Sequence, residues 1–277
     1  MINWFPGHMN KTIKQMQADS RLCSCFLYVL DARCPMSCIN PEFERVVGKK
    51  PIIYILNKAD LISEKDKSRI LLTFKNQNKI ALPLNATKSG NGKVIINAIK
   101  QIMQKVLTSN AEKGVNFITR AMVLGVPNSG KSTIVNNLCK TARAVTGNKA
   151  GVTRNKQWVK VEDNIEIMDT PGVLLPTFED ENKAYNLAFV GSVKDDVLNL
   201  TDIAMRLIAK LNSIDNTILP TKYGVTYDDN TLEIDILKSI GKKRGCLIKG
   251  GEIDLERASR LVLTDFRAGK LGLICLE

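Results

Sequence analysis

One glycine-rich segment, running from Gly125 to Ser132 (GVPNSGKS), constrains the fold of this chain more than any other feature. It fits the pattern G-x-x-x-x-G-K-[ST], follows the apolar run 118–125 and precedes the helix-like run 131–140. Glycines let consecutive backbone N–H groups wrap a phosphate, and the positive end of the following helix adds to the attraction. The segment therefore predicts a phosphate-binding loop between a strand and a helix. Within it, Lys131 is expected to reach the β- and γ-phosphates, and the Ser132 hydroxyl to ligate Mg²⁺.

The rest of the chain supplies the sheet that such a loop requires. Short runs rich in apolar and β-branched residues alternate with helix-like polar segments, which favours an α/β fold with a doubly wound, mostly parallel sheet. The expected strands are CFLYVLD (25–31), PIIYILN (51–57), KIALPLN (79–85), ITRAMVLG (118–125) and two within 157–169, around a turn at Asp163-Asn164. Beyond about residue 180 the pattern has helical periodicity, so we expect a helical domain there.

A further part of the phosphate site is expected downstream, where the apolar run 165–169 ends in Asp169-Thr-Pro-Gly172. A carboxylate at the end of a strand can hold the Mg²⁺ shell through water, and a glycine N–H can sense the γ-phosphate. Between the two motifs, Thr153 is the candidate switch threonine, which closes on Mg²⁺ and the γ-phosphate and releases after hydrolysis. The predicted metal ligands are therefore Ser132, Thr153 and Asp169, and Lys131 and Thr153 are also predicted to act in catalysis.

The motif Asn57-Lys-Ala-Asp60 directly follows a predicted strand. An aspartate carboxylate can accept hydrogen bonds from both N1–H and N2–H of guanine, whereas adenine offers no such pair of donors. The motif predicts a guanine site, and Asn85-Ala86-Thr87, at the end of the next strand, fits an element that supports the base through its backbone. The predicted nucleotide contacts are Asn57, Lys58, Ala59, Asp60, Asn85, Ala86, Asn128, Ser129, Gly130, Lys131, Ser132, Thr133 and Gly172.

Base recognition precedes the phosphate loop along this chain, opposite to the order in most switch GTPases. A parallel sheet tolerates such a circular permutation, because the termini of a domain often lie close together and can be joined. The polar stretch 107–117 is the expected joint. Because the 169–172 motif leads directly into the helical domain, a switch movement there could pull on that domain.

These motifs, together with several that GTPases do not generally carry, resemble the ribosome biogenesis GTPase A (YlqF-type) family of circularly permuted GTPases. The resemblance covers essentially the whole chain. It is carried by WFPGHM (4–9), DARCPMSCINP (31–41), NKAD, GVPNSGKST, KAGVT, QWVKV (157–161), DTPGVLLPTFED, KRGCLIKGG (243–251) and DFRAGKLG (265–272). The chain departs from the family pattern at Ile39, Ala150 and Ser129 among others, and of these Ser129 lies in the phosphate loop itself.

The resemblance implies a permuted P-loop GTPase domain over 1–182, with a base-recognition half (1–108) and a phosphate-binding half (118–182), and a small all-helical RNA-binding domain over 183–277. It implies a GTPase of low intrinsic rate, stimulated by the large ribosomal subunit and acting late in its assembly. Such a protein binds rRNA in the GTP state and is released after hydrolysis. Two alternatives are a GTP-binding RNA scaffold and a GTPase acting on a non-ribosomal RNA.

Two features of the expected mechanism follow from the resemblance. Val173 stands where many switch GTPases carry a glutamine that orients the attacking water, and the single histidine of the chain is His8. The resemblance implies a catalytic His8, since an imidazole can position or deprotonate water near neutral pH; the alternative is a surface or packing histidine. Similar GTPases with asparagine at the position of Asn128 bind K⁺ beside the phosphates, which adds K⁺ to GTP and Mg²⁺ as a candidate cofactor. The alternative for Asn128 is a residue that merely suits a turn.

The formal net charge is +12, which favours an anionic partner such as RNA. The excess of basic residues is concentrated in residues 1–184, while 238–270 is a second, local basic stretch. With the family resemblance, phosphate binding to rRNA becomes the preferred interpretation of the basic helix face near the C-terminus. The predicted RNA-binding residues are Arg33, Lys242, Lys243, Arg244, Arg257, Arg260 and Arg267.

The chain has seven cysteines and no pattern of a secretory signal, so a disulfide framework is not expected. Cys23 and Cys25 stand at the edge of a predicted buried strand, which favours small apolar side chains over zinc ligands. No apolar run reaches the roughly 18 residues of a membrane span. We therefore expect a cytoplasmic protein that is monomeric away from the ribosome.

Overall fold

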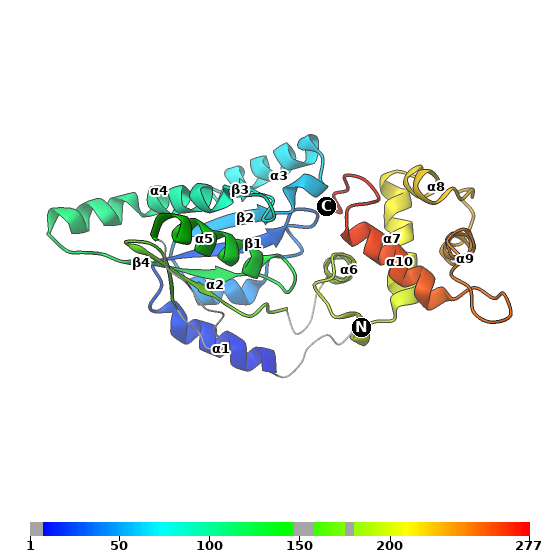
Figure 1. Cartoon of the computed structure of the whole chain (residues 1–277), viewed down its shortest axis with the longest axis horizontal. Helices are drawn as coiled ribbons and strands as arrows, with labels where there is room; N and C mark the ends of the chain where they lie inside the picture. The colour runs from blue at the N-terminus through cyan, green and yellow to red at the C-terminus, as the bar shows by residue number, and fades with distance from the viewer. Residues whose placement is uncertain (1–7, 147–157, 175–179) are drawn as a thin grey trace. The chain divides into compact units, whose positions relative to one another are not determined.

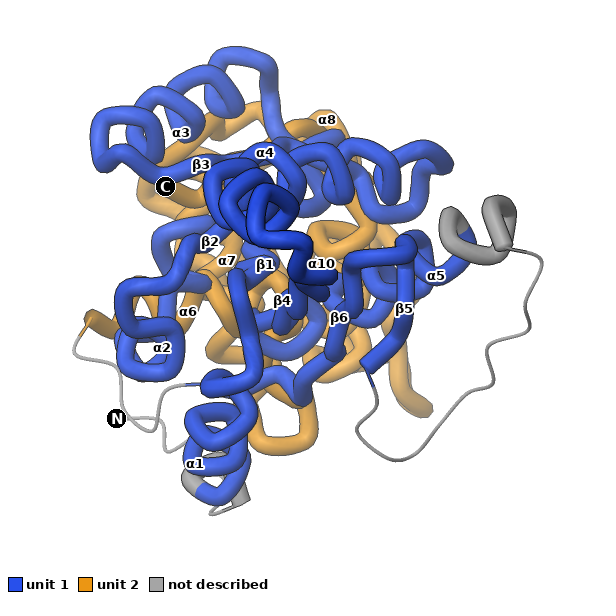
Figure 2. Tube along the Cα trace, turned by 90° about the vertical axis from the view of Figure 1, so that its left-hand side faces the viewer, with its two compact units in different colours: residues 1–177 blue, residues 178–277 orange. Residues whose placement is uncertain are grey.

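The structure is a computed structural model that describes residues 8–146, 158–174 and 180–277, with side chains over 11–140, 158–174 and 180–277. The chain divides into two compact units, residues 1–177 and 178–277 (Figures 1 and 2). The predicted boundary, between 182 and 183, falls a few residues later than this division. It would cut the first helix of the second unit, α6 (Glu181–Phe189), just after its start.

Six strands in the described part of unit 1 form one sheet, in the order β3-β2-β1-β4-β6-β5. The neighbouring pairs from β3 to β6 are parallel, and β5 pairs antiparallel with β6 across the turn at Asp163-Asn164. The strands are β1 (Cys25–Asp31), β2 (Ile52–Asn57), β3 (Ile80–Pro83), β4 (Thr119–Leu124), β5 (Val159–Glu162) and β6 (Ile165–Asp169). Each apolar run that predicted a strand forms one, which confirms the α/β fold.

Helices cover both faces of this sheet (Figure 1). On one face, side chains such as Leu27 and Val123 pack against α4 and α5. On the other face, Tyr28 stacks on Tyr54 and meets Phe43 of α2, while Tyr54 contacts Phe74 of α3. All residues of β1 are buried, because this central strand has a covered surface on each side. The helices of unit 1 are α1 (His8–Ser20), α2 (Pro41–Val47), η1 (Ala59–Leu61), α3 (Glu64–Asn76), α4 (Asn91–Glu112) and α5 (Lys131–Thr146).

The expected joint of the permutation is shorter than the sequence suggested. The stretch 107–117 was predicted as a polar connection, but α4 continues to Glu112. Its apolar stripe, with Ile99 and Met103 buried, continues to the partly buried Leu107, which packs against the same core. The helix ends at Lys113, and Gly114 then takes a positive φ of 67°. The non-helical part of the joint therefore lies between α4 and β4.

Unit 2 is helical in its described part, as its periodicity predicted. The amphipathic helix α7 (Leu200–Ile214) packs against α6, α8, α9 and α10, and its buried side chains include Ile203, Leu207 and Leu211. The remaining elements are η2 (Asp195–Val197), α8 (Ile218–Tyr223), α9 (Glu233–Lys243) and α10 (Leu255–Arg267). None of the helices that the structure describes combines the length and apolar character needed to cross a bilayer.

Candidate nucleotide-binding site

The predicted base and phosphate motifs meet at the carboxyl ends of neighbouring strands in unit 1. In a parallel sheet these ends share one edge, so loops far apart in the sequence converge there. The loops enclose a cavity of about 350 Å³. It is lined by Asn57, Lys58, Asn85, Ala86, Thr87, Asn128, Gly130, Lys131, Ser132 and Thr133. Thr87, which belongs to the element expected from the sequence to support the base, lines the cavity together with Asn85 and Ala86.

The phosphate loop joins β4 to α5 and needs glycine for two separate reasons. Gly125 and Gly130 have φ angles of 148° and 98°, which L side chains rarely adopt. Space is equally limiting: a Cβ at Gly125 would lie 2.4 Å from the Val29 carbonyl oxygen, and one at Gly130 would lie 2.1 Å from Asn57 Nδ2. The loop therefore lies directly against β1 and the base motif. This close approach brings the two halves of the permuted domain together.

Asn57 connects three parts of the site. Its Nδ2 donates to the Ser129 carbonyl at 2.8 Å, and its Oδ1 accepts from the Ala86 N–H at 2.9 Å. The side chain is buried, so both bonds are shielded from water. Asp60, on the short helix η1, is exposed and has its carboxylate available to a ligand. Asn57 thus has a structural role, while Asp60 is exposed next to the base motif and is not among the residues that line the cavity.

Lys131 is poised for an anion. It is buried and donates to the Val126 carbonyl at 2.9 Å. Burial lowers the pKa of its ammonium group from 10.5 to about 8, and the nearby Asp169 carboxylate opposes that shift only partly. A buried cation held by one carbonyl gains strongly when a phosphate supplies the missing negative charge.

The residues proposed for Mg²⁺ fit a hard cation. Ser132 Oγ donates to Asp169 Oδ2 at 3.0 Å, so the hydroxyl and carboxylate oxygens are adjacent and one ion could contact both. Asp169 Oδ1 is buried and accepts no hydrogen bond from the described residues. Hydroxyl and carboxylate oxygens are the ligands that Mg²⁺ prefers. An orphaned carboxylate oxygen beside the phosphate loop is what a metal shell would satisfy.

The segment after β6 lies against the phosphate loop. A Cβ at Gly172 would lie 2.6 Å from Pro127 and 2.9 Å from Lys131 Nζ, so glycine is required there. Val173 and Leu174 are buried, and neither can orient water. Thr153 lies outside the described residues, as does the side chain of His8, whose backbone begins α1.

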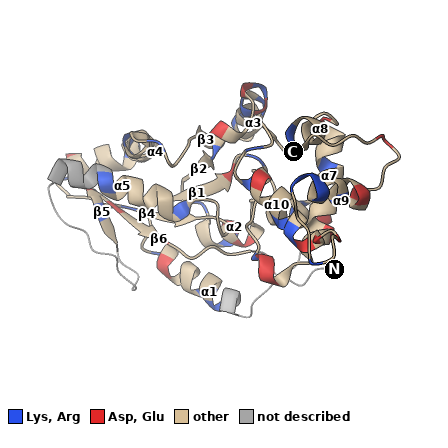
Figure 3. Cartoon of the chain, turned by 45° about the vertical axis from the view of Figure 1, so that its right-hand side comes forward, with Lys and Arg blue, Asp and Glu red and all other residues tan. Residues whose placement is uncertain are grey.

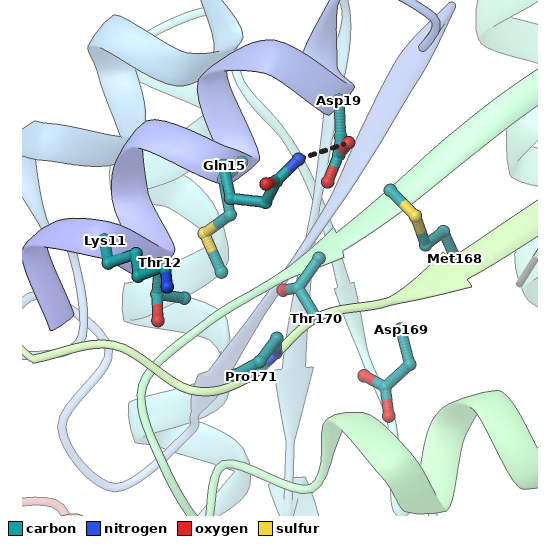
Figure 4. A pocket seen from close by; sticks show the side chains of 9 residues that line it. Lys11, Thr12, Gln15, Asp19, Met168, Asp169, Thr170 and Pro171 are labelled. Carbon is teal, nitrogen blue, oxygen red and sulfur yellow. Dashed lines mark hydrogen bonds between the residues drawn. The ribbon is translucent and has the colours of Figure 1, made fainter. Parts of the chain in front are cut away.

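A second cavity, of about 300 Å³, was not predicted from the sequence (Figure 4). It lies between α1 and the end of β6, with Met16 and Met168 among its lining residues. Asp169, Thr170 and Pro171 of the switch motif face it from one side. The spacing of Ile13 and Met16, both buried, is the sequence signal that α1 packs here. The helix that starts at His8 therefore adjoins the switch motif.

Two of the predicted RNA-binding residues occupy different positions from those expected. Arg33 is 1% exposed and pairs with Asp31, so its guanidinium is enclosed in the protein rather than presented to a partner. Arg267 donates to both carboxylate oxygens of Asp195, at 2.9 and 3.0 Å, and to the carbonyls of Ala188 and Phe189. Guanidinium donors that are used inside the protein are not available to clamp a phosphate, so these contacts argue against a role for Arg33 and Arg267 in RNA binding.

The other five predicted RNA-binding residues are exposed. They are Lys242, Lys243, Arg244, Arg257 and Arg260. Arg244 lies over the Tyr223 ring and donates to the Lys222 carbonyl, and Arg260 pairs with Glu256 one turn away. Basic and acidic side chains both occur on α10 (Figure 3).

Comparison with known proteins decides the family. A family described as 50S ribosome-binding GTPase matches residues 120–232. The chain is 37% identical to ribosome biogenesis GTPase A of Bacillus cereus, over 100% of this chain and 94% of that protein. The chain belongs to the ribosome biogenesis GTPase A family. It is also 30% identical to ribosome biogenesis GTPase A of Thermotoga maritima, over 100% and 94% of the two chains.

Solved structures of this family share the fold. GDP-bound YlqF matches with a TM-score of 0.64 and 27% identity, covering 95% of this chain and 98% of that one. GNP-bound YlqF from T. maritima matches equally well, over 96% and 97% of the two chains. Family membership and fold together confirm the permuted GTPase architecture and a guanine-nucleotide ligand.

Proposed function

We propose that this chain is a GTP-hydrolysing switch that acts in late assembly of the large ribosomal subunit, binding rRNA in its GTP state and leaving after hydrolysis. The relatives are named for ribosome biogenesis, and the matching family for 50S binding. The observation that carries the nucleotide part is the Asn57 side chain, bonded at once to the phosphate loop and to the Asn85-Ala86 element. It joins base reading and phosphate binding into one site.

Each predicted contact has a role in this proposal. Asp60 accepts the two guanine donors, and Asn85 and Ala86 support the base edge. Gly130, Thr133 and their neighbours in the phosphate loop donate backbone N–H groups, while Lys131 neutralises the β- and γ-phosphates. The chemistry that Mg²⁺ would supply there is neutralisation of negative charge on the phosphates. Ser132 and Asp169 would hold the ion, and Thr153 would close over it.

The site implies a slow enzyme that its partner accelerates. Val173 and Leu174 are buried where a water-orienting side chain would stand, so the attacking water requires another group. We propose that His8 supplies it, once the ribosomal particle fixes the segment before α1. We further propose K⁺ beside Asn128, whose backbone φ is 58° in the phosphate loop. Such a cation would stabilise negative charge on the phosphates in the transition state.

The test is GTP hydrolysis by the purified protein in K⁺ buffer, alone and with purified large or small ribosomal subunits. We expect a rise of tenfold or more with the large subunit only, because ordering a catalytic group contributes on the order of 10²–10⁴-fold. His8→Ala should lose most of the stimulated rate and keep GTP affinity. Replacing K⁺ by Na⁺ should slow the reaction; equal rates would remove K⁺ from the mechanism.

One alternative keeps a specific observation in its favour. The buried Val173-Leu174 pair also suits a GTP-binding scaffold that scarcely turns over. Binding to the large subunit without stimulated hydrolysis would favour the scaffold. Stimulation by an RNA other than that of the large subunit would instead favour a GTPase of another RNA.

A further inference from the structure

Asp31, at the carboxyl end of β1, belongs to neither the base motif nor the phosphate loop, yet its contacts reach the nucleotide cavity. Its carboxylate is 1% exposed. It accepts from Lys58 Nζ at 2.8 Å, from Arg33 Nη2 at 2.9 Å and from Arg33 Nε at 3.0 Å. Lys58 lines the cavity, and its Nζ also donates to the Asn128 carbonyl at 3.1 Å. A buried carboxylate thus connects to the phosphate loop through the lysine of the base motif.

Arg33 and Lys58 determine the charge state of Asp31. Burial by itself opposes ionisation of Asp31, but the hydrogen bonds and positive charges of Arg33 and Lys58 outweigh it, so the pKa of Asp31 lies below its ordinary value. The residue is therefore an anion between two cations. A buried charge of this kind persists only where its partners hold it in good geometry.

The base motif holds two successive carbonyls of the phosphate loop with two successive side chains. Asn57 Nδ2 bonds the Ser129 carbonyl, and Lys58 Nζ bonds the Asn128 carbonyl. Asn57 is fixed by its own second bond to Ala86. Lys58 is a long, flexible side chain on a residue with a φ of 59°, an uncommon conformation for a residue other than glycine. Its ammonium group needs an anchor to stay at the loop.

We propose that Asp31 is a positioning residue for nucleotide binding: its carboxylate holds the Lys58 ammonium at the phosphate loop, so that the lysine stem forms a fixed wall of the nucleotide cavity. Arg33 orients the carboxylate from the opposite side and balances its charge. This inference rests on the proposed nucleotide site. It gives the buried segment that starts at Asp31 a part in GTP binding, although no atom of Asp31 touches the ligand.

The test is a double-mutant cycle on GDP affinity, measured by isothermal titration calorimetry. Asp31→Asn alone would leave the Arg33 guanidinium buried and unpaired, so the cycle is made in an Arg33→Met background. The four proteins are R33M, R33M/D31N, R33M/K58M and the triple variant. R33M/D31N retains the net charge of the native cluster, because one anion and one cation are removed together. Circular dichroism and urea unfolding show whether each protein is folded.

We expect Asp31→Asn to weaken GDP binding about tenfold when Lys58 is present, since it replaces a charge-assisted hydrogen bond by a neutral one. With Lys58→Met, the same substitution should change the affinity less than twofold, because the group that Asp31 positions is gone. Hydrolysis at saturating GTP should change less than twofold in R33M/D31N, because Asp31 acts on binding rather than on the transferred phosphate.

The cycle separates failure of this inference from failure of the proposed site. Equal weakening in both Lys58 backgrounds would mean that Asp31 acts through the fold at large, which overturns the proposal. So would an affinity of R33M/D31N equal to that of R33M while R33M/K58M binds more weakly. If the wild-type chain failed to bind GDP, the proposed site itself would be wrong. Should the R33M proteins not fold, the same four comparisons are made with Arg33 retained, and the same outcomes decide.

Discussion

At the scale of a single residue, Lys131 lowers the stability of the nucleotide-free fold and favours the binding of a phosphate. Its ammonium group is buried before any phosphate arrives, and burial lowers its pKa to about 8. Below about pH 8 the folded protein therefore carries a charged ammonium group that has lost most of its hydration. The Val126 carbonyl offsets part of this loss of hydration, and the negative charge of a bound nucleotide would offset the rest.

Lys131→Met should therefore stabilise the nucleotide-free protein while abolishing GTP binding. We expect the free energy of unfolding to rise by about 3 kcal/mol at pH 7, because burial lowers the pKa of Lys131 from 10.5 to about 8. Between pH 8 and 10.5 the unfolded wild-type chain binds a proton at this lysine and the folded chain does not. Wild-type stability therefore rises with pH in that window, and the advantage of the variant shrinks.

The measurement is urea unfolding without nucleotide at pH 7 and pH 9.5, followed by tryptophan fluorescence. Both tryptophans, Trp4 and Trp158, belong to unit 1, so the signal reports the unit that contains the site. Lys140→Met is the matched control, since Lys140 is exposed on the same helix, and it should change neither stability nor binding. A loss of stability in Lys131→Met at pH 7 would contradict the argument.

At the scale of elements, the strands and the loop between β4 and α5 could be predicted because their signals are local. An apolar run such as CFLYVLD has few alternatives to a buried strand, and G-x-x-x-x-G-K-S needs its backbone conformation. The end of α4 was predicted too early because residues 107–117 are mostly polar, although Leu107 continues the apolar stripe of the helix. The positions of Arg33 and Arg267 could not be predicted, because pairing with Asp31 and Asp195 is visible only in three dimensions. Local motifs therefore predict where the site lies, whereas the ion pairs that support the fold around it become visible only in the structure.

The supporting role of Arg267 can be measured, because this residue joins three elements of unit 2. It ends α10, bonds the last carbonyls of α6 and pairs with Asp195 of η2. Its side chain is 23% exposed. Arg267→Met should lower the stability of unit 2 by about 2 kcal/mol, less than for a fully buried pair because solvent screens part of the interaction.

Arg260→Met is the matched control on the same helix. Its pair with Glu256 is exposed on both sides and screened by solvent, so the substitution should leave the stability essentially unchanged. In urea unfolding of the full chain, circular dichroism at 222 nm reports the helices of both units, while tryptophan fluorescence reports unit 1, so a change seen only by circular dichroism belongs to unit 2. Equal effects of the two substitutions would show that Arg267 is a surface residue after all.

At the scale of the whole molecule, charge separates two ways of meeting RNA. The net charge of +12 could act as a diffuse attraction, carried mainly by the basic excess of residues 1–184. Alternatively, a local set could clamp phosphates, for which the exposed residues of α9 and α10 are the candidates: Lys242, Lys243, Arg257 and Arg260. The two differ in how affinity for the large subunit falls with salt, because each phosphate contact releases counterions.

Replacing those four residues by glutamine should reduce the slope of log affinity against log salt by about one for each lost phosphate contact. The control lowers the net charge equally by replacing four exposed lysines of unit 1, Lys65, Lys75, Lys93 and Lys105. Diffuse attraction predicts the same modest change in both proteins, whereas a local clamp predicts a shallower slope only in the first. Co-sedimentation with large subunits across a salt series measures both. A control that matches the first variant would place RNA binding in the general charge of the molecule and remove α9 and α10 from the interface.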